Sequence, residues 1–91
     1  MKYEVRFTRQ FKRDLKLAKK GKDLNQLYDI IEQLANGETL DEKYRDHELK
    51  GEYEGSRECH IEPDWLLIYE IQGEVLVLTL YRPGSHSELF G

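Results

Sequence analysis

The feature that most constrains the fold is the run Trp65–Ile71, in which apolar side chains occupy both alternating sets of positions. A strand with one face in water alternates apolar and polar residues, whereas a strand inside a covered sheet is apolar on both faces. The run therefore predicts an interior strand. The pair Gln72-Gly73 predicts a tight hairpin turn, and Val75–Tyr81 predicts the next strand, with its leucines on one face.

Two other stretches alternate at the period of a β-strand. Residues 2–7 alternate apolar and charged side chains. Residues 56–62 place Glu58 and His60 on one face and Cys59 on the other. We therefore expect a strand at the start of the chain and another just before the interior strand, with Cys59 as a small core residue.

The segment between these strands has the pattern of two helices. Thr8 can cap the first helix, and Gly21 is predicted to end it. The second helix is predicted to begin at Asp23 or Asn25 and to stop at Asn36-Gly37. Their apolar stripes are Phe11, Leu15 and Ala18 in the first helix, and Leu24, Leu27, Tyr28, Ile31 and Leu34 in the second. Two helices joined this closely form a hairpin, whose apolar stripes need a sheet to pack against.

The order of these elements predicts the fold class. Residues 37–46 are predicted to be a polar connection, and His47–Gly51 a short extended piece. The resulting order, β-α-α-β-β-β, is typical of an α+β fold with both helices on one face of a mostly antiparallel sheet. A chain of 91 residues buries roughly 60–65% of its unfolded surface, so we expect one domain, residues 1–91.

Composition excludes several classes of protein. The chain has one cysteine, so a disulfide framework and a cysteine-rich zinc module are both excluded. No apolar run approaches the ~18 residues of a membrane span, and the first residues lack the apolar core of a secretory signal. We therefore expect a cytoplasmic protein without a membrane partner.

The net charge of −4 hides an uneven distribution. Residues 1–22 hold nine basic and two acidic residues, a net +7, and the remainder holds five basic and sixteen acidic residues, a net −11. Most of the basic residues of the first 22 lie in the first predicted helix or directly after it, away from its apolar stripe. They are Arg9, Lys12, Arg13, Lys16, Lys19 and Lys20. This helix indicates either an anionic partner or a solvated face balanced by acidic neighbours.

The residues suited to chemistry lie outside the two predicted helices. They are His47, His60, His86, Glu58, Asp64 and Arg82. Cleavage of RNA through the ribose 2′-hydroxyl needs a base, an acid for the leaving 5′ oxygen and a cation near the phosphate, and it needs no metal. Histidine can serve as base or acid near neutral pH, and arginine matches phosphate geometry. Phe90 is either a core residue or an exposed aromatic residue, and an exposed aromatic residue beside a phosphate site can stack on a base.

Other interpretations stay open at this point. Three histidines with acidic residues also suggest a zinc site, although their spacings of 13 and 26 residues match no compact zinc pattern. Each residue also has a structural interpretation: a histidine on a strand, a turn cap at Asp64, or surface ion pairs for Glu58 and Arg82.

Three stretches together resemble a known family. They are Asp46–Gly51 (DHELKG), Gly55–Tyr69 (GSRECHIEPDWLLIY) and the ending Arg82–Gly91 (RPGSHSELFG). The chain resembles the YafQ branch of the RelE superfamily along nearly its whole length. The resemblance implies a microbial-RNase-like α+β fold and a bacterial type II toxin, a small endoribonuclease that cuts mRNA in the ribosomal A site. It also implies a DinJ-like antitoxin of the ribbon-helix-helix type, through which alone the toxin meets operator DNA.

The resemblance also implies roles for particular residues. His47, His60, Asp64 and His86 match the family's catalytic positions. Arg82 matches the arginine that contacts phosphate, and Phe90 matches an aromatic residue of the mRNA site. Glu58 stands where the pattern usually has aspartate, so the acid is one methylene longer. We expect His47 or His60 to be the base, His86 to be the acid, and the basic first helix to contact ribosomal RNA through phosphates. Alternatives are a weakly catalytic corepressor, a metal-dependent hydrolase and an RNase of free RNA.

Overall fold

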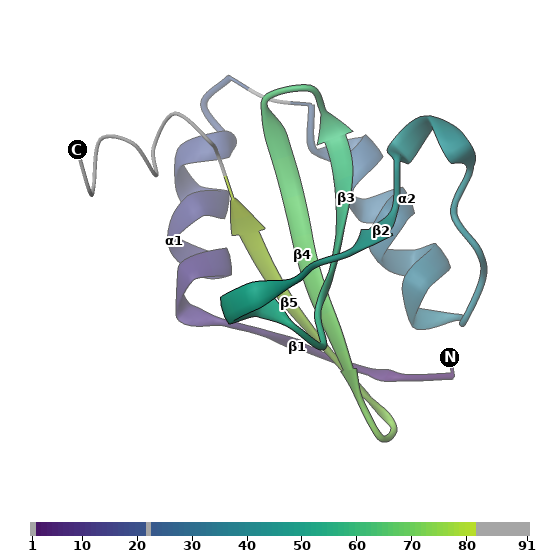
Figure 1. Cartoon of the computed structure of the whole chain (residues 1–91). Helices are drawn as coiled ribbons and strands as arrows, with labels where there is room; N and C mark the ends of the chain where they lie inside the picture. Colours follow the sequence, from purple (N-terminus) through teal and green to yellow (C-terminus); the bar gives the residue numbers. More distant parts are fainter. Residues whose placement is uncertain (1, 22, 82–91) are drawn as a thin grey trace.

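The interior strand predicted from the apolar run lies in the middle of a five-stranded sheet. The computed structural model describes residues 2–21 and 23–81 (Figure 1). The strand order is β1-β5-β4-β3-β2, with β4 hydrogen-bonded to β3 and to β5 in antiparallel fashion. The first strand closes the far edge and runs parallel to β5. The elements are β1 (Glu4–Phe7), α1 (Arg9–Ala18), α2 (Leu24–Ala35), β2 (His47–Glu48), β3 (Arg57–Glu62), β4 (Trp65–Gln72) and β5 (Val75–Tyr81).

Both helices begin at the caps that the sequence predicts. The Thr8 hydroxyl accepts a hydrogen bond from the backbone N–H of Phe11 at 3.1 Å, and Asp23 accepts one from Asn25 at 2.9 Å. Each cap satisfies an N–H group that the first turn of a helix leaves without a partner. α2 stops at Asn36, and Gly37 follows with a φ of 77°.

Two boundaries that differ from the prediction are the end of α1 and the β4–β5 turn. α1 ends at Ala18 instead of continuing to Gly21, which lies in the following turn and donates its N–H to Ala18. The β4–β5 turn is shifted by one residue, because Gln72 still pairs with Val75. Glycine at position 73 takes the positive φ of 64° that this turn needs.

The predicted polar connection also contributes to the core. Residues 37–46 contain a 3₁₀ turn at Glu42–Tyr44, and within this segment Leu40 and Tyr44 are buried. The expected extended piece shortens to β2, because a second 3₁₀ turn begins at Gly51. These differences arise because local pattern does not show which connecting residues the helices and the sheet will cover.

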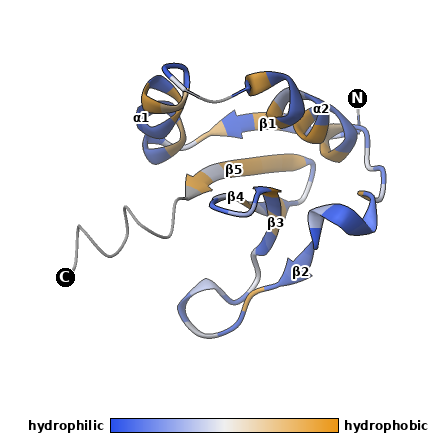
Figure 2. Cartoon of the chain, turned by 90° about the horizontal axis from the view of Figure 1, so that it is seen from above, coloured by the Kyte–Doolittle hydropathy of each residue, from blue (hydrophilic) through white to orange (hydrophobic). Residues whose placement is uncertain are grey.

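Both helices pack on one face of the sheet, as predicted (Figure 2). This helix-covered face and the two helices contribute the buried core: Phe11, Leu27, Ile30, Cys59, Ile61, Trp65, Leu67, Tyr69, Leu76, Leu78 and Leu80, among others. The opposite face, which we call the open face, carries the buried Leu66 and several side chains that are only half-buried, among them Glu58, His60, Ile68 and Thr79. The α+β fold class is therefore confirmed.

Within residues 2–21 and 23–81, no helix combines the length and the apolar character that crossing a bilayer requires.

Candidate active site

The pairing of β2 with β3 brings together two of the predicted site residues. His47 lies opposite Glu58 in the antiparallel register. Its Nε2 is 3.3 Å from Oε1 of Glu58, whose side chain is only 15% exposed, whereas the imidazole is 47% exposed. A carboxylate that is largely withdrawn from water interacts more strongly with a nearby charge than one on the surface does. His47 and Glu58 therefore form a closely spaced pair of titratable side chains on the open face.

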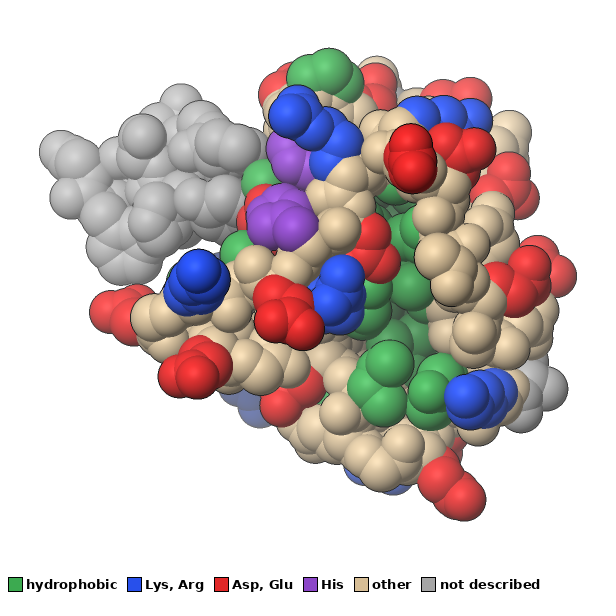
Figure 3. All heavy atoms as spheres, turned by 45° about the vertical axis from the view of Figure 1, so that its right-hand side comes forward, with side chains coloured by type: hydrophobic (Ala, Val, Ile, Leu, Met, Phe, Trp, Pro, Cys, Tyr) green, Lys and Arg blue, Asp and Glu red, His purple; other side chains and the backbone are tan. Residues whose placement is uncertain are grey.

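His60 joins this pair from the next residue of β3 on the same face. Its ring centroid lies 6.1 Å from that of His47, at an interplanar angle of 42°. One ligand-type atom from each of His47, Glu58 and His60 lies within 4.8 Å of the others. We call these three residues the open-face cluster. The histidine side chains of the described part of the chain gather on one side of the molecule in Figure 3.

The ring of His47 lies between two acceptor groups. Nδ1 lies 2.7 Å from the carbonyl oxygen of Arg45, and Nε2 faces the carboxylate of Glu58 at 3.3 Å. Arg45 presents its carbonyl from a left-handed backbone conformation, with φ 53°. The imidazole of His47 is thus held at both ring nitrogens.

The other predicted site residues fall into two groups. Asp64 is exposed and lies in the turn between β3 and β4, past a register shift that separates His60 from Glu62. Arg82, His86 and Phe90 lie outside the described residues. The last described residue, Tyr81 at the end of β5, pairs with Leu66, which pairs with His60.

Cys59 is a core residue, as its position on the strand predicts. Its side chain has no exposed surface. Burial raises the pKa of the Cys59 thiol to about 12, and the negative charges of Asp46 and Glu58 add to the shift. A thiol that stays protonated at neutral pH is a poor nucleophile. This confirms the prediction that Cys59 packs in the core.

The basic residues of α1 lie apart from the open-face cluster. Arg9, Lys12, Arg13, Lys16, Lys19 and Lys20 are all exposed. Phe11 and Ala18 bury the other side of the helix in the core. Because the helix packs on the covered face, its basic surface and the cluster lie on opposite sides of the sheet. A ligand that contacts both would have to reach around the molecule.

The sequence did not reveal one polar network beneath β2. Arg57 donates from Nε to Oδ1 of Asp46 at 2.8 Å, and its NH1 lies 3.4 Å from Oε1 of Glu48. The hydroxyl of Tyr69 donates to the other carboxylate oxygen of Asp46. One signal was present: Arg57 alternates with Cys59 on the core-facing side of its strand, where a charged group needs a partner.

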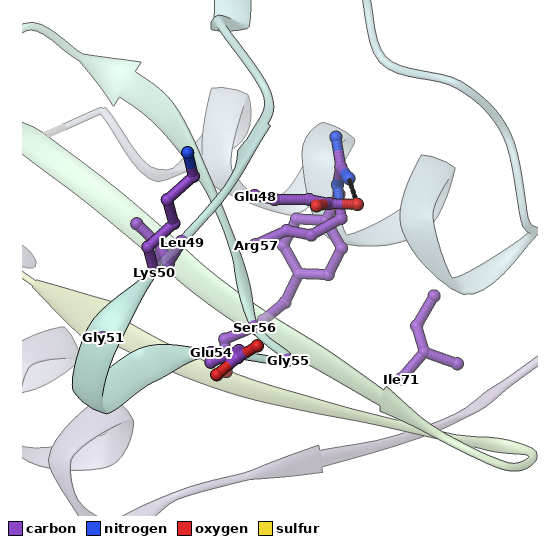
Figure 4. A pocket seen from close by; sticks show the side chains of 10 residues that line it. Glu48, Leu49, Lys50, Gly51, Glu54, Gly55, Ser56, Arg57 and Ile71 are labelled. Carbon is purple, nitrogen blue, oxygen red and sulfur yellow. Dashed lines mark hydrogen bonds and ion pairs between the residues drawn. The ribbon is translucent and has the colours of Figure 1, made fainter.

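A cavity of about 680 Å³ lies beside this network, away from the open-face cluster (Figure 4). Glu48, Lys50, Glu54, Ser56, Arg57 and Tyr69 are among the residues that line it. Charges of both signs line its wall. The charges in the cavity wall therefore favour neither an anionic nor a cationic ligand.

Together with this fold and site, the comparison with known protein families places the chain in a defined class. The chain is a toxin of a bacterial type II toxin–antitoxin system. The profile of the family described as the bacterial toxin of the type II toxin-antitoxin system, YafQ, matches residues 3–91, and the chain belongs to that family. The resemblance found in the sequence is thereby confirmed.

Individual relatives agree with this assignment. The mRNA interferase toxin YafQ of Escherichia coli K12 is 39% identical over 90 residues, which make up 97% of this chain and 96% of the relative. A copper-bound mutant toxin from Helicobacter pylori has a TM-score of 0.84 at 38% identity, covering 97% of this chain and 99% of its own. In an E. coli DinJ–YafQ complex, the matching chain has a TM-score of 0.81 at 36% identity, covering 98% of this chain and 99% of its own. An mRNA interferase is an endoribonuclease, so the predicted enzyme class is confirmed.

Proposed function

We propose that this toxin cleaves mRNA in the ribosomal A site by metal-free acid–base chemistry. The observation that carries the proposal is the open-face cluster, which combines two imidazoles with a carboxylate on a sheet face that neither helix covers. Attack of the ribose 2′ oxygen on phosphorus needs a base to accept the 2′ proton. Departure of the 5′ oxygen needs a proton from an acid, and the negative charge on phosphate needs a cation.

The cluster contains the groups that the proposal needs for proton transfer. His47 and His60 lie on one face with Glu58 between them in the chain, and either imidazole can accept the 2′ proton near neutral pH. The resemblance implies that His86 is the acid and that Arg82 binds phosphate, with Asp64 orienting a histidine or acting as a base and Phe90 stacking on the mRNA. These assignments remain part of the proposal.

Partners follow from the same reasoning. The relative from E. coli forms a complex with DinJ. We expect a DinJ-like antitoxin to neutralise this chain and to bring it to operator DNA. The exposed basic surface of α1 matches ribosomal RNA, because contacts with phosphates need charge and not base recognition.

Primer extension on an mRNA translated in vitro tests the proposal. We expect cuts only on translated message, reduced about 100-fold by Glu58→Gln or His60→Ala, which remove a proton acceptor and keep the fold. Ile68→Val, a conservative change on the neighbouring strand of the same face, is the matched control and should leave cleavage within about twofold. Equal cutting of untranslated RNA would contradict ribosome dependence. An absence of cuts by the folded protein would favour the corepressor.

A metal-dependent hydrolase is the second candidate, and the ligand geometry of the open-face cluster supports it. The H. pylori toxin related to this chain is copper-bound. In the acid–base mechanism, a bound metal would occupy the lone pairs that accept protons, so added Zn²⁺ or Cu²⁺ should inhibit and EDTA should not. Loss of cleavage in EDTA, with recovery on adding one metal, would favour the second candidate.

A further inference from the structure

His47 lies on a weakly supported element. β2 has two residues and forms one edge of the sheet, and among residues 2–21 and 23–81 its one partner strand is β3. A strand this short contributes few backbone hydrogen bonds, and these alone do not fix a side chain. Catalysis by His47 would nevertheless require a defined ring position, because the proton-transfer partners must lie within hydrogen-bonding distance.

Side chains on the covered face hold the backbone on both sides of His47. The guanidinium of Arg57 binds Asp46 and Glu48, the two carboxylates that flank His47 in the chain. Figure 4 shows Arg57 and Glu48 pointing toward each other. Tyr69, on the central strand β4, donates its hydroxyl to Asp46 as well. We call Asp46, Glu48, Arg57 and Tyr69 the clamp.

Burial strengthens the part of the clamp formed by Tyr69 and Asp46, whereas the side chain of Glu48 is 80% exposed. Tyr69 is 4% exposed, and the side chain of Asp46 is 21% exposed. Hydrogen bonds to a charged group are stronger where water is largely excluded. Burial is the main cause that raises the pKa of Tyr69, and its hydrogen bond to Asp46 adds to it. The hydrogen bond with Asp46 likewise raises the pKa of Arg57. Both donors therefore keep their protons over the working range of the enzyme.

We propose that the clamp positions His47 for catalysis. By binding the residues before and after His47 from beneath the sheet, it holds the imidazole between Glu58 and the carbonyl of Arg45 on the open face. The clamp side chains lie on the other side of the strands, so they are positioning residues and not catalytic ones. The inference rests on the proposed nuclease function. A displacement of about 1 Å in a reacting group can lower a rate about 100-fold.

Tyr69→Phe is the sharpest variant because it removes one hydroxyl and keeps the buried ring. We expect kcat for cleavage on the ribosome to fall about tenfold, with KM within about twofold. Asp46→Asn should lower kcat at least as far, since it loses the charge that binds Arg57. Tyr28→Phe removes an exposed tyrosine hydroxyl on α2 and serves as the matched control, with no change in kcat. Unchanged kcat in both clamp variants would overturn the proposal.

Repeating the measurement in the His47→Ala variant distinguishes an effect of Tyr69 on the position of His47 from an effect of Tyr69 on the stability of the fold. In His47→Ala, the clamp has no imidazole to position, so adding Tyr69→Phe should change cleavage by less than about twofold. A further tenfold loss in that background would show that Tyr69 acts through the fold, which would overturn the proposal. Thermal unfolding should be measured beside the rates for the parent, for the two single variants Tyr69→Phe and His47→Ala, and for the double variant.

Nitrogen-15 NMR of the histidine rings tests the clamp independently of nuclease activity. In the parent we expect a protected Nδ1 proton on His47, which Tyr69→Phe should expose to rapid exchange while the His60 signals stay unchanged. If the parent makes no cuts on translated mRNA, the proposed function fails, and this measurement still decides the clamp. If the His47 signals are the same in the parent, Tyr69→Phe and Asp46→Asn, the clamp fails even in an active nuclease.

Discussion

The two faces of the sheet are built from the same strands but differ in how far their side chains are buried. On the covered face, Leu67, Leu76, Leu78 and Leu80 have no exposed surface, and the helices exclude water from them. On the open face, most residues one step along the same strands are only half-buried, with the buried Leu66 as an exception, and the open-face cluster lies among them. The covered face therefore stabilises the fold, while the open face can hold charged and titratable groups at a small cost in solvation.

The clamp connects these two faces. It uses the covered face, where hydrogen bonds to a carboxylate are strong, to fix a histidine on the open face, where a substrate can reach it. This division explains why Arg57, a charged residue on the core-facing side of β3, is compatible with the fold. Its charge is matched by Asp46 and Glu48.

The largest expected effect compares two adjacent residues of β4. Leu67 points into the covered face and is fully buried, whereas Ile68 points to the open face and is half-buried. Leu67→Ala should lower the free energy of unfolding by about 3 kcal/mol, because it leaves a cavity that the helices and the sheet cannot fill. Ile68→Ala should lower it by about 1 kcal/mol. Urea unfolding followed by circular dichroism measures both, and equal losses would show that the two faces are packed alike.

The second-largest expected effect is a fall in the free energy of unfolding at alkaline pH, caused by a buried thiol on the covered face. Burial raises the pKa of the Cys59 thiol from its ordinary value of 9.0 to about 12 in the folded protein. The unfolded chain therefore loses this proton first, so stability should be full below about pH 9 and should fall as pH rises toward 12. Near pH 10.5 the loss attributable to Cys59 should be about 2 kcal/mol.

Cys59→Ala is the control for this pH dependence. The variant removes the thiol, so its stability should fall less steeply over the same range, with the remaining slope due to Tyr69, whose pKa burial also raises. Urea midpoints between about pH 7 and 11 provide the measurement. Identical slopes in the parent and in Cys59→Ala would mean that the thiol is not what titrates.

The smallest expected effect lies on the outer surface of α1, which belongs to neither face of the sheet. Lys12→Ala and Lys16→Ala replace exposed side chains, so each should change the free energy of unfolding by less than about 0.5 kcal/mol. Each should also lower the salt dependence of ribosome binding by about one charge. Binding titrations at several salt concentrations measure this slope. An unchanged slope in both variants would separate α1 from ribosomal RNA and leave its basic surface as a solvated face.

Local pattern predicted most of the elements. The caps at Thr8 and Asp23, the stop at Asn36 and the interior position of β4 follow from interactions within a few residues. The end of α1 and the β4–β5 turn were misplaced by one to a few residues, because competing turn residues lie next to each other. The parallel pairing of β1 with β5 joins segments about 70 residues apart, and no local signal specifies it.

For the candidate site as well, some features were predicted from the sequence and others depended on the tertiary structure. The sequence nominated His47, His60 and Glu58 through residue type and resemblance, and the strand period placed His60 and Glu58 on one face. The antiparallel register of β2 and β3 decided that His47 lies against Glu58. Which of His47 and His60 is the base stays a prediction.

The sequence by itself determined the helices, the strands, the covered face and the types of residue available for chemistry, since these depend on periodicity and on contacts within a few residues. Only the tertiary structure decided which strands are neighbours and how Asp46, Arg57 and Tyr69 meet beneath His47. The physical reason is that hydrogen bonds and ion pairs act over a few ångströms in space. Residues separated by 11 and 23 positions along the chain come within that range only after the sheet has formed.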